Sequence, residues 1–259
     1  MSGVAIVTGG ASGIGAAVAA LLCARGWRVV VFDLAPEPAR QPAQQSATGP
    51  DFAGWFRVDI ADEQAVEDAV ARVEDEIGPV HGLVNAAGVL GKMHAPDRLR
   101  MSDWDREIAV DLRGTYLTCR AAGARMARRG GGAIVNIASI AGMTSGPLHG
   151  YGPAKAAVIS LTTTLAGEWG PRGVRVNAVS PGFTRTQALE KGVEAGALDA
   201  EALARPSAMR RLVEPGEIAS AVAFLLGPEA GGITGVNLPV DAGYLVGVTW
   251  QPYGGVRGA

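Results

Sequence analysis

The sequence predicts an α/β protein built as one domain, residues 1–259, around a doubly wound parallel sheet with helices on both faces. Three observations lead to this fold. Seven short apolar runs alternate with segments of helical periodicity, which is typical of βαβ units. The runs are continuously apolar, so each strand is expected to be covered on both faces. Neither an internal repeat nor a linker divides the chain into two domains.

The seven expected strands are rich in valine and isoleucine, as β-structure favours. They span residues 4–7, 28–32, 54–58, 81–84, 133–137, 175–179 and 236–240.

Helical periodicity predicts four long helices between these strands. Three of them span residues 16–25, 104–126 and 151–169. The fourth begins after Asp62, a candidate N-cap, and ends before Gly78-Pro79. Residues 35–54, rich in Pro, Ala and Gln, interrupt the alternation, and we expect a loop or a frayed helix there.

The composition excludes several classes of function. A formal net charge of -2 and a pI near 6.0 provide no basic surface for nucleic acid or anionic lipid. Cys23 and Cys119 lie in amphipathic helical segments, where we expect buried free thiols rather than a disulfide or metal ligands, in a reducing compartment. No basic leader or long apolar stretch precedes the first strand, so we expect a cytoplasmic protein without a signal peptide or membrane span.

A glycine-rich turn, Thr8-Gly9-Gly10-Ala11-Ser12-Gly13-Ile14-Gly15, joins the first strand to the first helix. Glycines let the backbone turn tightly and approach a pyrophosphate, whose charge is then met by the free N–H groups of the helix N-terminus. Glycines also end strands for structural reasons alone. In the order strand, turn and helix, however, they predict a Rossmann-type dinucleotide site.

Asp33 stands at the end of the second expected strand, where a carboxylate accepts hydrogen bonds from the hydroxyls of the adenosine ribose. The same carboxylate would repel a 2′-phosphate, and neither Ala11 nor Leu34 supplies a cation. These residues favour NAD over NADP. The alternative is that Asp33 serves only as a turn residue at the strand end.

Ser139, Tyr151 and Lys155 follow downstream, the last two in a Y-x-x-x-K pattern. With the T-G-x-x-x-G-I-G turn they make the sequence similar to the compact, single-domain, NAD-dependent branch of the short-chain dehydrogenase/reductase family. The resemblance covers essentially the whole chain and implies a homotetramer. Further matching segments are Asp59-Ile60, Asn85-Ala86-Ala87-Gly88, and Pro181-Gly182 with Thr186. The cofactor contacts that the resemblance implies are Gly9, Ser12, Gly13, Ile14, Gly15, Asp33, Leu34, Asp59, Ile60, Asn85, Ala86, Ala87, Gly88, Tyr151, Lys155, Pro181, Gly182, Phe183, Thr184 and Thr186.

Three positions depart from the family pattern. Ala86 replaces a second asparagine, which should weaken one bracing contact. Asp111 stands where members usually carry asparagine. By resemblance this position kinks the long helix and holds a water for the lysine, largely through its backbone carbonyl, so Asp111 stays in the expected catalytic set. The spacing from Ser139 to Tyr151 is one residue shorter than in many relatives, which should reshape the substrate wall.

The chemistry expected of these residues is proton exchange with a substrate hydroxyl. Tyr151 and Lys155 lie on one helix face, four residues apart. A unit charge about 5 Å away stabilises a phenolate by roughly 3 kcal/mol at an effective dielectric of about 20, which allows proton exchange near neutral pH. Ser139 would donate a hydrogen bond to the developing carbonyl oxygen, and the resemblance implies that Lys155 also binds the nicotinamide ribose. Each residue taken alone also has an ordinary structural explanation.

The expected activity is hydride transfer between NAD(H) and a secondary alcohol or ketone. No arginine pair suggests a carboxylate substrate, so we favour a small or cyclic, largely uncharged one. We expect a lid at residues 186–211 and a subunit contact at residues 250–255. The alternatives are a catalytically silent NAD(H) sensor and an isomerase or dehydratase that retains its NAD. By resemblance the substrate would face Leu90, Ile140, Met143, His149, Phe183 and residues 187–209.

Overall fold

The computed structural model describes residues 3–37, 52–91 and 93–257. Within them lies one sheet of seven parallel strands, which confirms the predicted fold class. The observed strand ends lie within two residues of the expected ones. The strands are β1 (Val4–Thr8), β2 (Arg28–Asp33), β3 (Phe52–Arg57), β4 (Val80–Asn85), β5 (Gly132–Ile137), β6 (Val174–Pro181) and β7 (Asn237–Val240).

The strand order is β3-β2-β1-β4-β5-β6-β7, so the chain reverses its winding direction between β1 and β4. Strands that follow β1 extend the sheet one way, and those after β4 extend it the other way. The loops leaving β1 and β4 therefore diverge above the carboxyl ends of neighbouring strands. In sheets of this type, that crevice is where ligands bind.

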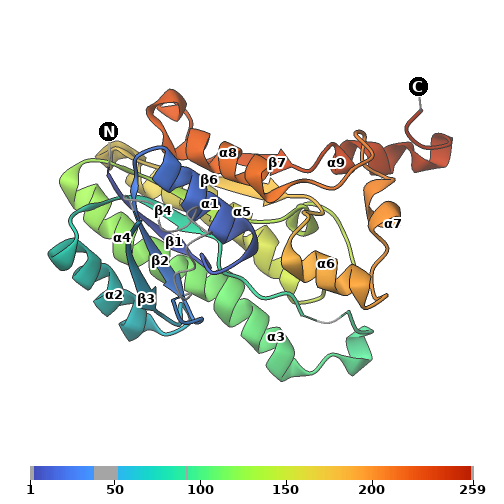
Figure 1. Cartoon of the computed structure of the whole chain (residues 1–259), viewed down its shortest axis with the longest axis horizontal. Coiled ribbons are helices and arrows are strands. Elements are labelled where there is room, and N and C mark those ends of the chain that lie inside the picture. The colour runs from blue at the N-terminus through green and yellow to red at the C-terminus, as the bar shows by residue number, and fades with distance from the viewer. Residues whose placement is uncertain (1–2, 38–51, 92, 258–259) are drawn as a thin grey trace, which may run out of the picture.

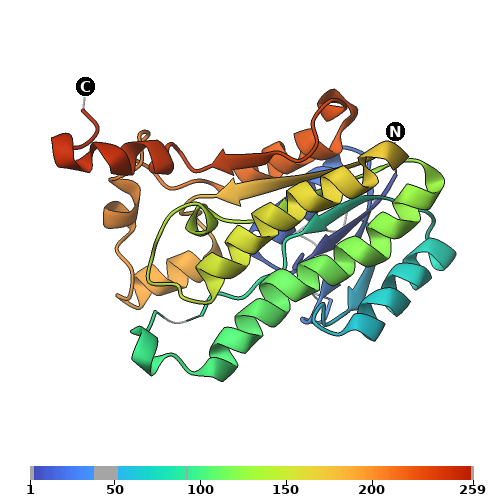
Figure 2. The same ribbon diagram turned by 180° about the vertical axis from the view of Figure 1, so that it is seen from behind.

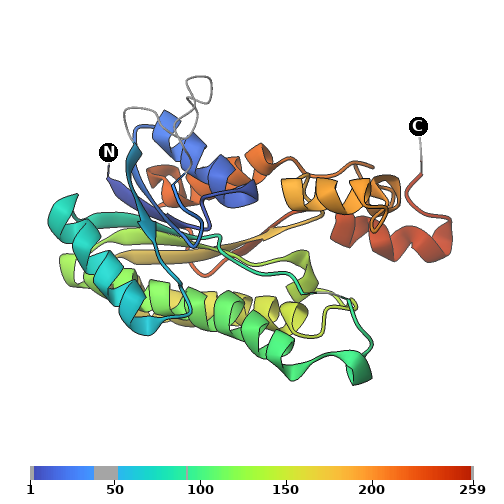
Figure 3. The ribbon, with the colours of Figure 1, turned by 60° about the horizontal axis from the view of Figure 1, so that its bottom comes forward.

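Two helical layers cover the sheet, as Figures 2 and 3 show. On one face α1 (Gly13–Ala24) packs against α8 (Pro215–Leu226). On the other lie α2 (Glu63–Glu76), α4 (Thr115–Arg129) and α5 (Tyr151–Trp169). Successive strand residues point to opposite faces. Ile6 thus belongs to the core under α2 and α4, while Val7 belongs to the core under α1 and α8.

The expected helices form, with one informative difference. Asp62 caps α2 by accepting a hydrogen bond from the N–H of Ala65, and α5 has the expected bounds. The helix expected at 104–126 is longer and contains a change of winding. It begins as α3 (Met101–Glu107), continues as a π-helical segment (Ile108–Gly114) and ends as α4.

The segments beyond the carboxyl ends of the strands gather on one side of the molecule, together with the C-terminal end (Figure 1). They include α6 (Gln187–Glu194), α7 (Ala200–Ala204) and α9 (Tyr244–Gly247), so the expected lid is partly helical. Short 3-10 helices occupy Pro96–Arg98, Ile140–Gly142, Gly170–Arg172, Pro228–Ala230 and Val248–Tyr253.

Part of the loop expected at 35–54 lies outside the described residues, namely 38–51. Its last residues belong to β3, which begins at Phe52, two residues earlier than expected. Within the described ranges, no helix combines the length and apolar character needed to cross a membrane. No group of three or more His, Cys, Asp or Glu side chains in the same ranges is arranged to hold a metal ion.

Candidate active site

A cleft of ≈ 540 Å³ lies at the carboxyl ends of the central strands, where the sheet reverses direction. Most residues expected to bind a dinucleotide line it. These are Gly9, Ser12, Gly13, Ile14, Gly15, Asp33, Leu34, Asp59, Ile60, Ala86, Ala87, Gly88 and Thr186. Asn85, Tyr151, Lys155, Pro181, Gly182, Phe183 and Thr184 do not line the cleft itself.

The glycine-rich turn is shaped by close backbone approach. Gly9 and Gly13 adopt left-handed conformations, with φ of 69° and 55°. A Cβ at Gly15 would lie 2.1 Å from the carbonyl oxygen of Gly9, and one at Gly9 would lie 2.6 Å from Cα of Ala87. The turn therefore brings bare backbone to the start of α1. Ser12, the N-cap residue, makes no side-chain capping bond there, so the residues present fit a pyrophosphate.

Asp33 is held at the mouth of this turn. Its Oδ2 accepts a hydrogen bond from the N–H of Ala11 (2.9 Å), and its Oδ1 accepts one from the N–H of Ala35 (2.9 Å). Asp33 thus stabilises the turns beside it, which is the alternative role that the sequence left open. Each carboxylate oxygen can accept a second hydrogen bond, so that role is compatible with binding ribose hydroxyls.

A buried polar network braces the loop after β4. Oγ1 of Thr8 accepts hydrogen bonds from the N–H groups of Ala86 and Ala87 (3.1 and 3.0 Å). Asn85 is 2% exposed; its amide donates to Oδ1 of Asn136 (2.9 Å) and its Oδ1 accepts from the hydroxyl of Thr118 (2.6 Å). The side chain of Asn85 therefore supports the cleft from behind. Cys119 lies in the same network, and burial raises the pKa of its thiol to about 12.

The expected catalytic residues occupy the neighbouring end of β5 and the start of α5. Oγ of Ser139 accepts a hydrogen bond from the N–H of Ala141 (3.1 Å). The 3-10 turn that follows packs on α5, because a Cβ at Gly142 would lie 2.6 Å from the nitrogen of Ala156. Tyr151 is the first residue of α5, and Nζ of Lys155 lies 5.4 Å from the centre of its ring. The structure thus brings Tyr151 and Lys155 together beside the strand end that carries Ser139.

Lys155 is not the isolated cation assumed from the sequence. It is 4% exposed, and its ammonium donates to the carbonyl oxygen of Ile137 (3.0 Å). Oδ1 of Asp111 lies 3.3 Å from the same nitrogen. A carboxylate this close offsets part of the lysine charge that was expected to stabilise a phenolate.

Asp111 lies in the π-helical segment, where the resemblance implied a kink, and its side chain adds a direct contact with Lys155. Its backbone carbonyl accepts from the hydroxyl of Thr115 (2.9 Å), while its side chain pairs with Lys155 and accepts from the N–H of Val89 (3.2 Å). Asp111 is completely buried, and this burial raises the pKa of its carboxyl, although Lys155 opposes the rise. The carboxylate can contact the lysine directly because Asp111 lies in the π-helical segment, where its side chain points to α5.

Glu107 is a site residue that the sequence reasoning missed. It is 5% exposed, and its carboxylate lies against the backbone of Gly91 and Gly150. Burial and the nearby carboxylate of Asp111 raise its pKa, and the backbone N–H groups of Tyr151 and Gly91 oppose the rise. The sequence did contain a signal for Glu107, because Glu107 and Asp111 are four residues apart and therefore share a helix face.

Comparisons with known proteins agree with this geometry. A family model described as enoyl-(acyl carrier protein) reductase matches residues 9–245. A solved chain described as a short chain dehydrogenase/reductase family protein is 37% identical, with a TM-score of 0.79, over 93% of this chain and 97% of that one. The chain belongs to the short-chain dehydrogenase/reductase family. Membership places it among oxidoreductases that bind nicotinamide cofactors.

Two further relatives show how varied the described activities of similar chains are. D-threitol dehydrogenase of Mycolicibacterium smegmatis is 40% identical over 94% of this chain and 93% of its own length. A solved chain described as ribose-5-phosphate isomerase from Brucella melitensis 16M is 50% identical, with a TM-score of 0.91, and the match covers 99% of this chain and 98% of that one. The first name describes a dehydrogenase of D-threitol, and the second an isomerase of ribose 5-phosphate.

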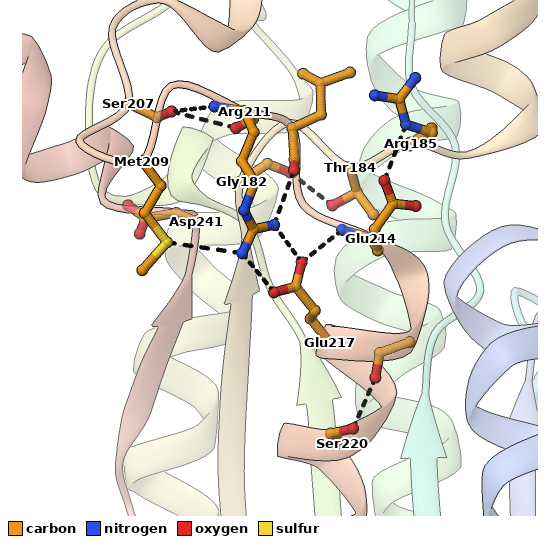
Figure 4. A network of polar contacts seen from close by, with 12 residues as sticks. Gly182, Thr184, Arg185, Ser207, Met209, Arg211, Glu214, Glu217, Ser220 and Asp241 are labelled. Carbon is orange, nitrogen blue, oxygen red and sulfur yellow. Dashed lines mark hydrogen bonds and ion pairs between the residues drawn. The ribbon is translucent and has the colours of Figure 1, made fainter. Parts of the chain in front are cut away.

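In this family member the segment after β6 is anchored at its far end by a polar network, shown in Figure 4. Both terminal nitrogens of Arg211 contact the carboxylate of Glu217 (2.7 Å each). That carboxylate also accepts from the N–H of Glu214, completing a capping box at the start of α8. Arg185 bonds to Glu214 (3.0 Å), so both ends of the segment 186–211 are tied to α8.

Several cleft-lining residues of this short-chain dehydrogenase/reductase were not expected from the sequence. Three of them come from the helix that carries Asp111, and the others flank the ends of β2, β3 and β4. They are Phe32, Val58, Ala61, Val89, Arg106, Ala109 and Val110.

Proposed function

We propose that the chain is an NAD-dependent dehydrogenase and ketone reductase that acts on a secondary alcohol or its ketone, with Tyr151 as general acid and base. The observation that carries this proposal is the pairing of Tyr151 with a buried lysine ammonium at the end of β5, beside the dinucleotide cleft. A tyrosine so placed can exchange a proton with a substrate hydroxyl.

The residues of the cleft fit NAD. The bare turn at Gly9 to Gly15 would hold the pyrophosphate, and the Asp33 carboxylate would accept from the ribose hydroxyls and repel a 2′-phosphate. Asp59 and Ile60 would flank the adenine. Residues 181–184 and Thr186 would border the nicotinamide. When bound, the nicotinamide supplies the hydride acceptor or donor of the reaction.

Three side chains then act on the substrate. In the oxidation direction Tyr151 accepts the hydroxyl proton, and in the reduction direction it returns that proton to the carbonyl oxygen. Ser139 donates a hydrogen bond to the same oxygen, where negative charge develops. Lys155 stabilises the phenolate electrostatically and binds the nicotinamide ribose, while Asp111 holds its ammonium in place.

An acyclic polyol is the first substrate to test, because D-threitol dehydrogenase is among the similar chains. The residues expected to face it include Leu90 and Met143, which are 67% and 44% exposed. We propose that residues 186–211 close over the bound substrate as a lid, since α6 begins at the rim of the cleft with Gln187 and Ala188.

The decisive experiment is a screen of polyols, cyclic alcohols and ketones with NAD(H) and NADP(H), following nicotinamide absorbance. Turnover with NAD supports the proposal. The Tyr151→Phe variant should then lose at least about a hundredfold in kcat, while its NAD affinity, measured by calorimetry, stays unchanged. Tyr116→Phe, which alters an exposed tyrosine of α4, serves as the matched control.

Two outcomes of the same screen would overturn the proposal. Conversion of ribose 5-phosphate to its ketose without net NADH would favour the isomerase that its 50% identical neighbour suggests. NAD binding without turnover of any alcohol, ketone or sugar phosphate would favour a sensor.

A further inference from the structure

Helix α5, which carries Tyr151 and Lys155, has no capping side chain of its own at its N-terminus. Gly150, the N-cap residue of α5, has no side chain, and the first turn of α5 contains no acidic residue. Helix N-termini carry N–H groups without intrahelical partners, and a carboxylate is their preferred acceptor. At the start of α5 the N–H of Gly152 bonds to the carbonyl oxygen of Leu148 (2.9 Å), and Pro153 has no N–H. The N–H of Tyr151 interacts instead with the carboxylate of Glu107 at the end of α3, whose Oε2 lies against Gly150.

The Glu107 carboxylate is enclosed between three segments. Its Oε1 lies against Gly91 in the loop after β4, where a Cβ would come within 1.5 Å. Its Oε2 lies against Gly150, where a Cβ would come within 2.3 Å. Trp104 closes the same space, since its ring lies 3.2 Å from a Cβ at Gly150. Two positions without side chains thus leave room for one buried carboxylate.

We propose that Glu107 is a positioning residue for Tyr151, acting as a cap for α5 supplied from α3 and as the charge-coupled neighbour of Asp111. This inference rests on the proposed function of Tyr151. Glu107 affects the site through two contacts. Its interaction with the N–H of Tyr151 fixes the position at which Tyr151 begins α5. Its charge acts on Asp111, the carboxylate that pairs with Lys155.

The charged and titratable groups around Glu107 come from two elements. Its own helical segment contributes Asp103 and Asp111, which both repel its negative form. On the α5 side, the N–H of Tyr151 faces Glu107, while Lys155 pairs with Asp111. In the loop after β4, the N–H of Gly91 faces Glu107 and that of Val89 bonds to Asp111. Burial raises the pKa values of both carboxyls, and repulsion by Asp111 adds to the rise at Glu107, so acid should protonate this pair earlier than ordinary carboxyls.

The pH dependence of ketone reduction separates the protonation of Glu107 and Asp111 from the protonation of Tyr151. Reduction needs the protonated phenol as proton donor, and acid favours that form. Loss of reductase activity on the acid side must therefore come from other groups. Protonation of Glu107 removes an acceptor from α5, and protonation of Asp111 removes the carboxylate paired with Lys155.

The test compares Glu107→Gln and Glu107→Asp with Asp105→Asn, a control that removes an exposed carboxylate from the same helix. In Glu107→Gln we expect kcat for ketone reduction to fall roughly tenfold to a hundredfold, with unchanged NADH affinity. The acid limb of the pH–kcat profile should move to lower pH, because one of the two carboxyl groups with a raised pKa has been removed. In Glu107→Asp, the shorter side chain should lower kcat by a similar factor, while the acid limb of the pH–kcat profile stays at the same pH.

A second readout is independent of activity. Hydrogen exchange of the cofactor-free protein, measured by mass spectrometry over residues 148–158, should be about fivefold faster in both Glu107 variants than in wild type. If Glu107→Gln does not fold, Glu107→Asp carries this measurement.

Unchanged kcat and unchanged exchange in a folded Glu107 variant would overturn the inference, even if Tyr151→Phe is inactive. A lower kcat in Glu107→Gln without movement of the acid limb would overturn the coupling to Asp111. If wild type turns over no substrate, the proposed function fails, but faster exchange would still support the cap.

Discussion

At the scale of single residues, the site differs from the expected one in the charge around Lys155. A lysine alone would give its full charge to the stabilisation of a phenolate. Here the ammonium contacts the Asp111 carboxylate at 3.3 Å, and both groups are buried. In the proposed mechanism, the Asp111 carboxylate therefore fixes the position of Lys155 but weakens the electrostatic stabilisation of the Tyr151 phenolate.

Replacing Asp111 with the asparagine usual in the family tests this balance. Asp111→Asn keeps an acceptor for the N–H of Val89 but removes the negative charge beside Lys155. The pH at which alcohol oxidation reaches half of its maximal kcat/KM should move down by about one unit. A pH profile of oxidation measures this, and an unchanged midpoint would show that Asp111 does not weaken the lysine charge.

We propose that the preference for NAD over NADP depends on Asp33. In Asp33→Ala the ribose hydroxyls lose a charged acceptor, so kcat/KM with NAD should fall roughly tenfold to a hundredfold relative to NADP. Asp59→Ala is the matched control, since this acid also lines the cleft and should weaken both cofactors alike. An unchanged NAD to NADP ratio in Asp33→Ala would restrict Asp33 to its turn role with Ala11 and Ala35.

At the scale of elements, the sequence predicted those whose signals are local. The strands follow from continuous apolar runs, and α2 follows from one apolar face with a cap at Asp62. The residues of the π-helical segment have ordinary helical periodicity, so only the family resemblance, which implied a kink at Asp111, indicated a change within this helix. The directions of Asp111 and Glu107 depend on that segment, so their contacts were missed although Tyr151 and Lys155 were recognised by spacing.

The start of α8 gives a stability prediction. Hydrogen bonds from Arg211 and from the N–H of Glu214 lower the pKa of Glu217 from 4.5 to about 2. This stabilisation is present above the ordinary pKa and is lost as pH falls toward 2. Because the pair is partly exposed, Glu217→Gln should lower the free energy of unfolding by only about 1 kcal/mol at neutral pH.

Urea denaturation of Glu217→Gln at neutral pH and at pH about 3 checks this sign. The difference from wild type should shrink in acid, where the wild-type carboxylate begins to protonate. Glu194→Gln, on the exposed surface of α6, provides the control. A difference that grows in acid would contradict the assignment of the stabilisation to ionised Glu217.

At the scale of the whole molecule, the C-terminal segment presents apolar surface beyond the sheet. Trp250 and Tyr253 are 45% and 86% exposed, and Arg210 bonds to the carbonyl oxygen of Val256, which ties this segment to the end of residues 186–211. Exposed aromatics of this kind are common in protein interfaces. We propose that they form a subunit contact in a cytoplasmic homotetramer.

Sedimentation velocity tests this assembly. Wild type should sediment as a tetramer of 26.5 kDa chains, and the double variant Trp250→Ser and Tyr253→Ser should dissociate to smaller species at low micromolar concentration. Leu34→Ser, which alters another exposed apolar residue at the cleft, is the control. An unchanged tetramer in the double variant would exclude the C-terminal segment as a required contact.

The π-helical segment has a consequence for which changes of chain length the protein can tolerate. One wide turn between α3 and α4 holds a residue more than an α-helical turn does. Deleting a single residue between Glu107 and Asp111 would return this turn to α-helical winding and shorten the spacing of the two carboxylates from four residues to three. The two carboxylates could then no longer keep their contacts with the start of α5 and with Lys155 together, although no contact residue had been replaced. Substitution of a residue in this segment other than Asp111 leaves the spacing of the acidic pair unchanged, whereas a change in chain length alters it at once.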